Sequence, residues 1–120
     1  MRDYKLADGE MKFTEIVWES EPIKSGELVT ICEEKFSWKK STTYTVLKKL
    51  CLRGILENNN SIVTSLISKE EYFKFKSQEF VKDTFDGSLP KFLAAFMGNK
   101  KLSKNQVEEL KNLIDEYEEE

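Results

Sequence analysis

The chain lacks most of the side chains that protein catalysis and metal binding use. It has no histidine and only two cysteines, Cys32 and Cys51, among its 120 residues. This excludes Ser-His-Asp and Cys-His catalysis, four-cysteine metal sites, and most zinc and non-haem iron sites. Three pairs of neighbouring glutamates remain, but side chains at adjacent helical positions do not face each other, so their carboxylates do not converge. We therefore expect no enzyme activity, no catalytic residue, no metal and no cofactor.

The residues best suited to binding are basic ones in the middle of the chain. Six basic residues and no Asp or Glu lie from Lys35 to Leu56, although the whole chain has a formal net charge of -3. A local basic surface is what contact with phosphates requires, and the net charge of a whole chain is a poor guide to it. The alternative interpretation is an ordinary helix face with solvated charges.

Apolar spacing predicts three helices before residue 54. Asp8 is a candidate N-cap for the first, and Ser25-Gly26 opens the second. The third runs from Ser41 to Arg53 and ends at Gly54. At 100° per residue, one side of this third helix is apolar and the opposite side polar. The inner side comprises Thr43, Val46, Leu47 and Leu50, and the outer side Ser41, Thr45, Lys48 and Leu52.

A β-hairpin and three further helices follow. Apolar and β-branched runs on both sides of Asn58-Asn59-Asn60 predict the hairpin, because Asn tolerates the positive φ of tight turns. Ser68, Ser88 and Ser103 are candidate N-caps for the last helices. Three helices followed by a two-stranded wing are typical of the winged helix-turn-helix. We expect a mainly α protein with a small β-hairpin wing, comprising a winged helix DNA-binding domain (1–67) and a helical dimerisation domain (68–120).

The second of these domains carries more large apolar side chains than it can bury alone. A helical unit below roughly 60 residues buries too little surface to be stable by itself. We therefore expect it to pair with its own copy through a two-fold axis. The candidate dimerisation residues are Phe85, Leu89, Phe92, Leu93, Phe96, Met97, Val107, Leu110 and Ile114.

Four segments, in order, resemble the penicillinase-repressor family (BlaI/MecI/CopY). The run from Ser37 to Gly54 is similar to the family's recognition-helix segment, with a Trp, a Thr-x-x-Thr, a basic-Leu pair and a closing basic-Gly. The segments 6–22, 68–72 and 102–110 fit as well. The resemblance implies a bacterial repressor that binds a palindromic operator as a homodimer, with the third helix in the major groove.

Three departures from the family pattern stand out. The wing is about four residues shorter than usual, and its tip has no Lys or Arg, so we expect it to bind phosphate weakly. Antibiotic-responsive members are cleaved by a regulatory protease at an Asn-Phe bond, and the matching position here is Ala95-Phe96. The missing Asn argues against that route. Copper-responsive members carry C-terminal Cys-x-Cys motifs, and this chain ends without cysteine, which excludes that metal switch.

The candidate DNA-binding residues lie on the third helix and just before it. In a major groove, hydroxyls can bond base edges and threonine methyls can pack on the methyl of thymine, whereas lysines suit phosphates. No Arg is available for bidentate reading of guanine, so we expect modest discrimination at each position. The candidates are Lys39, Lys40, Ser41, Thr42, Tyr44, Thr45, Lys48 and Lys49.

The tryptophans and cysteines are expected to serve packing. Trp18 falls at helical spacing with apolar residues, and Trp38 would seal the linker before the third helix, with a phosphate contact as the alternative. Lysines precede Cys51 closely, which predicts a lowered thiol pKa. Even so, we expect Cys32 and Cys51 to be packed as small apolar residues and not to form a redox switch.

The function that these observations predict is a sequence-specific, double-stranded DNA-binding repressor. No signal peptide and no membrane span is apparent, so we expect a cytoplasmic protein. The first alternative is a winged-helix protein-interaction module without specific DNA binding, which the net acidity and neutral wing favour. The second is a DNA-binding regulator gated by a ligand or by thiol redox chemistry.

Overall fold

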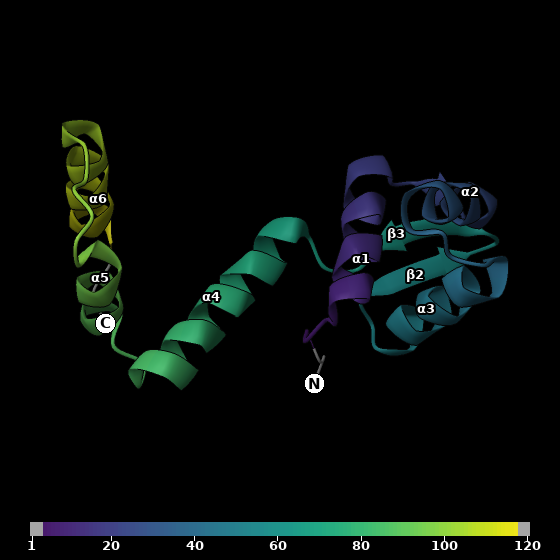
Figure 1. Ribbon diagram of the computed structural model, residues 1–120, viewed down its shortest axis with the longest axis horizontal. Helices are drawn as coiled ribbons and strands as arrows, with labels where there is room; N and C mark the ends of the chain where they lie inside the picture. Colours follow the sequence, from purple (N-terminus) through teal and green to yellow (C-terminus); the bar gives the residue numbers. More distant parts are fainter. Residues whose placement is uncertain (1–3, 118–120) are drawn as a thin grey trace. The chain divides into compact units, whose positions relative to one another are not determined.

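The computed structural model describes residues 4–117, and the chain divides into two compact units between Ser77 and Gln78 (Figure 1). The first unit contains α1 (Asp8–Ser20), β1 (Ile23–Lys24), α2 (Ser25–Phe36), α3 (Lys40–Leu52), β2 (Leu56–Asn59) and β3 (Ile62–Ser65). Helix α4 (Lys69–Phe85) begins in the first unit and ends in the second. The second unit continues with α5 (Leu89–Met97) and α6 (Lys104–Glu116). This is the expected mainly α fold with a hairpin wing.

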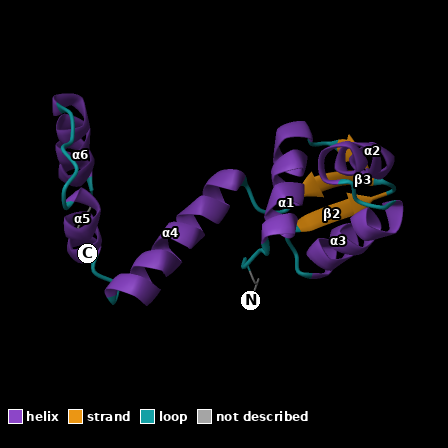
Figure 2. Ribbon diagram, in the orientation of Figure 1, coloured by secondary structure: helices purple, strands orange, loops and turns teal. Residues whose placement is uncertain are grey.

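The hairpin of β2 and β3 (Figure 2) belongs to a three-stranded antiparallel sheet with the order β1-β3-β2. Ile23 of β1 and Asn58 of β2 both pair with Val63 of β3. The turn lies at Asn60 and Ser61, with φ angles of 51° and 68°. Two positive φ angles are what a two-residue type I′ turn requires. The two-residue strand β1 was not predicted, because it is too short to show an alternating pattern.

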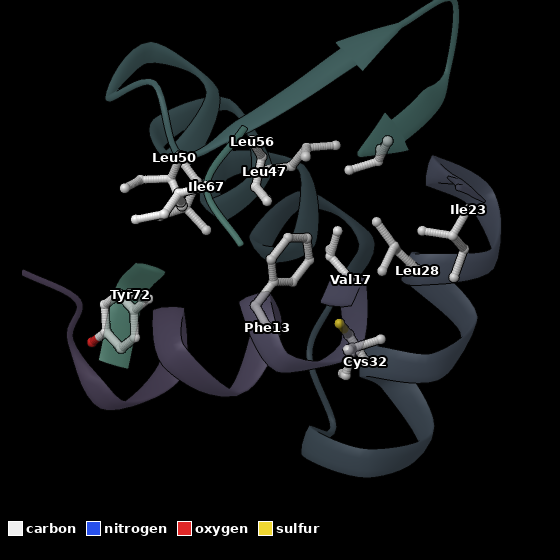
Figure 3. Close-up of a cluster of buried hydrophobic side chains, with 13 residues drawn as sticks. Phe13, Val17, Ile23, Leu28, Cys32, Leu47, Leu50, Leu56, Ile67 and Tyr72 are labelled. Carbon is white, nitrogen blue, oxygen red and sulfur yellow. The ribbon is translucent and has the colours of Figure 1, made fainter. Parts of the chain in front are cut away.

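The core of the first unit is formed by apolar residues from all of its elements. Phe13 and Val17 of α1, Leu28 of α2, Leu50 of α3 and Val63 of β3 each have 0% exposure. Figure 3 shows Phe13, Val17 and Leu28 side by side, with Leu50 packed nearby. The helical spacing therefore predicted correctly which side of α3 faces inward, and α1 and α2 likewise bury one side each. The opposite sides of these helices face solvent.

Both tryptophans pack inside the first unit, as predicted. The indole N–H of Trp18 donates to the backbone carbonyl of Ile67 at 3.0 Å, and its ring lies 5.5 Å from that of Tyr72. Trp38 lies almost parallel to Phe13, with ring centroids 6.2 Å apart. These contacts join the segments before α3 and α4 to the core, so they fix where both helices begin.

The start of α1 differs from the prediction by one position. Ala7 occupies the N-cap, and Asp8 is the first helical residue. Alanine has no side-chain oxygen, and the Glu10 carboxylate instead accepts from the Ala7 backbone N–H at 2.9 Å. The same carboxylate pairs with Arg53 at 3.1 Å. One acid therefore caps α1 and ties the end of α3 to it.

The second unit is held by helix caps and ring contacts. Asp86 and Gly87 adopt positive φ angles and separate α4 from α5. Ser88 caps α5 by accepting from the backbone N–H of Lys91, and a reciprocal capping box of Ser103 and Gln106 begins α6. Edge-to-face contacts link the rings of Phe80, Phe85 and Phe92. None of the residues described between 78 and 117 is buried.

Within residues 4–117, every helix is too short or too polar to span a lipid bilayer.

Candidate nucleic-acid interface

Helix α3 presents one polar face to solvent because its other face is anchored in the core. Thr43, Leu47 and Leu50 are at most 3% exposed and point inward. The structure brings all eight predicted DNA-binding residues together, on α3 and at its N-cap, and all of them are exposed. They are Lys39, Lys40, Ser41, Thr42, Tyr44, Thr45, Lys48 and Lys49.

The beginning of α3 has the features of an anion site without having a side-chain cap. Lys39 is the N-cap, and a lysine has no oxygen with which to accept from the first backbone N–H groups of the helix. Those N–H groups and the positive end of the helix dipole favour a phosphate oxygen. A hollow of about 540 Å³ lies beside this end, lined by Glu33, Ser37, Trp38, Lys39 and Lys40.

The basic surface of α3 is made of lysines alone. Lys39, Lys40, Lys48 and Lys49 are exposed. Arg53 also lies in the basic run of the sequence, but its guanidinium pairs with Glu10 and donates to the backbone carbonyl of Lys5. Its charge therefore serves to join α3 to α1, a role that sequence reasoning missed because Glu10 lies 43 residues away.

The hydroxyl of Thr45 is already engaged within α3. It donates to the backbone carbonyl of Ser41, one helical turn earlier, at 2.8 Å. This back-bond is a common arrangement for threonine in a helix. The Thr45 proton is therefore committed to the backbone, and the exposed remainder of the side chain is a methyl group and an oxygen that can only accept.

The wing offers no positive charge to a DNA backbone. Between Gly54 and Ser68 the only charged residue is Glu57, and it is exposed together with Asn58, Asn59 and Asn60. A hollow of about 390 Å³ on the wing is lined by Glu57, Asn59, Asn60, Ile62 and Thr64. Its polar groups are amides, a hydroxyl and one carboxylate, so ionic attraction to phosphates falls to α3.

Burial disfavours the thiolate form of both cysteines. Burial raises the pKa of Cys32, and the neighbouring Thr43 hydroxyl and the charge of Lys35 offset only part of that effect. Burial also raises the pKa of Cys51, against an opposing contact with the Asn58 backbone. The prediction that nearby lysines lower the pKa of Cys51 is wrong. The packing role expected for the two residues agrees with this, since Cys32 is buried and Cys51 half-buried.

The predicted dimerisation residues lie on α4, α5 and α6 and keep much of their apolar surface in contact with solvent. Leu89 and Phe96 are each 54% exposed and Ile114 is 63% exposed. Phe85, Phe92, Leu93, Met97, Val107 and Leu110 are half-buried. Leu113, at 67% exposure, belongs to the same α6 surface. Its position three residues after Leu110 was a signal that could have identified it.

The position that the sequence analysis compared with a cleavage site lies inside a helix. Ala95 and Phe96 are exposed residues of α5. Phe96 also lines a hollow of about 370 Å³ together with Leu102, Gln106, Glu109, Leu110 and Leu113. The bond between Ala95 and Phe96 is therefore accessible at the surface, but its backbone is helical.

Comparison with known proteins relates the whole chain to a group of bacterial regulators. The chain is 23% identical to the penicillinase repressor of Bacillus licheniformis over 117 residues, which cover 94% of this chain and 91% of that protein. It is 20% identical to the methicillin resistance regulatory protein MecI of Mammaliicoccus sciuri and to that of Staphylococcus epidermidis, with 94% of this chain and 95% of each relative covered. The model of the penicillinase repressor family matches residues 6–116. The chain belongs to the penicillinase repressor family of transcriptional repressors.

Proposed function

We propose that this repressor binds an inverted-repeat operator as a homodimer and blocks transcription by occupying a promoter. The observation that carries the proposal is the outer face of α3, which gathers hydroxyls and four lysines on one exposed helix. A helix of this width fits the major groove of B-form DNA. We place its action in the bacterial cytoplasm, where the promoter is.

The residues of α3 make two kinds of contact with DNA, one to phosphates and one to base edges. Lys39, Lys40, Lys48 and Lys49 neutralise phosphates and set the register of the helix, without distinguishing sequences. The backbone N–H groups at the start of α3 add a further phosphate contact. Ser41, Thr42, Tyr44 and Thr45 face the base edges. The wing, which has no cation, contributes polar contacts only.

The helices from about residue 68 onward pair two copies of the chain. Their exposed apolar side chains, among them Leu89, Phe96 and Ile114, fit pairing with an identical surface on a second chain. A two-fold dimer places two copies of α3 in successive major grooves, one helical turn apart.

Control by a protease at Ala95-Phe96 would require more than access to the bond. A protease cleaves an extended segment, so α5 would first have to unwind around these residues. With Asn absent from the cleaved position, we propose that relief of repression in this protein follows another route.

One observation favours a second function, a winged-helix module that binds a protein. The wing carries only Glu57 as a charge, which gives it no electrostatic attraction to DNA. Such a partner would need acidic residues opposite the lysines of α3.

Fluorescence anisotropy tests the proposal against this second function. The full-length protein is titrated onto the promoter duplex upstream of its own gene and onto an unrelated duplex, at two salt concentrations. A preference for the promoter that survives the higher salt supports a sequence-specific repressor. Equal binding that disappears with salt would reduce the interaction to electrostatic attraction and turn attention to a protein partner.

A further inference from the structure

The outer stripe of α3 has an unusual chemistry for a surface that reads DNA. The residues at its centre are Ser41, Thr45, Lys48 and Leu52, spaced so that they follow one another along the helix. Leu52 is 78% exposed. The exposed residues of α3 include no Arg, Asn, Gln, Asp or Glu. Apart from lysine, which can also bond guanine, these are the side chains that make paired hydrogen bonds with guanine or adenine, or accept from cytosine.

Thr45 sits at the middle of this stripe with its hydroxyl proton already used. Its Oγ1 donates to the carbonyl of Ser41 at 2.8 Å, so it has no proton to give to a base. The same hydrogen bond favours one rotamer of the side chain, whose methyl group is the remaining apolar part of an exposed residue. Of the four bases, only thymine presents a methyl group in the major groove.

We propose that Thr45 is a specificity-determining residue that selects thymine by methyl-to-methyl contact, with its hydroxyl serving only to orient the side chain. The inference rests on the proposed function, because it requires α3 to lie in a major groove. Lys48 on the same stripe serves phosphates and leaves the choice of thymine to Thr45. At this position the operator is then recognised through burial of apolar surface at a thymine, and not through a hydrogen bond.

Two conservative variants separate the methyl group from the hydroxyl. Thr45→Ser removes the methyl and keeps the hydroxyl, whereas Thr45→Val keeps a methyl at that position and removes the hydroxyl. The position is exposed, so neither change disturbs the core. Thr30 provides a matched control, because it is also exposed and its hydroxyl makes the same back-bond, to Gly26 at 3.3 Å, on α2. Thr30→Ser removes a methyl outside α3.

The DNA probes differ in whether one thymine carries its C5 methyl group. A preferred duplex is first selected from a random library with the full-length wild-type protein. It is then synthesised with each thymine replaced in turn by deoxyuracil, which pairs identically and lacks only the C5 methyl. Dissociation constants are measured by anisotropy for the wild-type protein and the three variants.

The proposal expects one thymine per half-site at which deoxyuracil weakens wild-type binding about fourfold, the factor for one buried methyl group. Thr45→Ser loses this dependence, whereas Thr45→Val and Thr30→Ser retain it. Equal affinities of the wild-type protein for the thymine and deoxyuracil duplexes would overturn the inference while leaving specific binding intact. An unchanged deoxyuracil effect in Thr45→Ser would also overturn it. Failure of the library to yield any preferred sequence would instead contradict the proposed function, and the inference with it.

Discussion

The two units of this chain differ in how far they bury their apolar side chains. In the first, Phe13, Val17 and Leu50 are fully enclosed by side chains of the same chain. In the second, none of the described residues is buried, and Phe96 and Ile114 keep more than half of their surface exposed. Apolar side chains on short helices stabilise a fold only when something covers them. The core of the first unit is therefore formed within one chain, whereas we propose that the exposed apolar side chains of the second are covered by a second copy.

The largest expected effect is the loss of stability when a core side chain of the first unit is truncated. Phe13→Ala leaves a cavity under α1 and lowers the free energy of unfolding by about 3 to 5 kcal/mol. Because the core lies within one chain, this loss is the same at low and high protein concentration. Urea unfolding at two concentrations measures it. A loss that grows on dilution would show that the first unit also depends on a partner.

A charge at the exposed apolar surface of the second unit acts on assembly. Phe96→Asp puts a carboxylate where the proposed interface is apolar, and weakens the dimer by about 2 kcal/mol or more, roughly 30-fold in the dissociation constant. Sedimentation velocity measures the change. The matched control is Leu52→Asp, which places the same charge at an exposed leucine of α3 and leaves the dimer unaffected. If the Phe96→Asp variant still sediments as a dimer, the dimer interface does not include Phe96.

Removing two lysines from α3 weakens DNA binding without changing assembly. Lys48→Ala combined with Lys49→Ala removes two phosphate contacts per protomer, and lowers the slope of log affinity against log salt by about 1.8 per protomer. The loss is uniform across duplex sequences, because phosphates carry no sequence information. Lys69→Ala combined with Lys74→Ala, on α4, serves as the control with an unchanged slope. Equal slopes for wild type and the α3 variant would exclude these lysines from the phosphate contacts.

The smallest expected effect is on the pH dependence of stability, and it comes from the burial of Cys32. Burial raises the pKa of this thiol above its ordinary value of 9.0, so the folded state retains its proton at a pH where the unfolded chain has lost it. The stability gained is fully present below the ordinary pKa and is lost as the pH rises through the raised value. Cys32→Ala removes this dependence. Urea unfolding of both proteins across the alkaline range tests it, and parallel curves for the two would contradict the effect.

The sequence predicted the helices and the outer face of α3 because these depend on local signals. Ser88 and Ser103 are strong N-caps, and the buried positions of α3 recur at helical spacing. Contacts between distant residues left no such signal. Arg53 was counted with the basic surface but pairs with Glu10, and Ser65 donates through its backbone N–H and hydroxyl to Glu21. The back-bond of Thr45 depends on a rotamer, which spacing does not reveal.

The most direct experiment determines whether dimerisation through the second unit strengthens DNA binding by the first. Wild-type protein and Phe96→Asp are titrated onto a duplex with the full inverted repeat and onto one with a single half-site. We expect the wild-type protein to bind the full site about 100-fold more tightly than the half-site, since the second contact is intramolecular. The variant should bind each half-site independently, without that advantage. A Phe96→Asp variant that keeps the full-site preference, or a wild-type protein that has none, would contradict the proposal that the first unit binds DNA and the second forms the dimer.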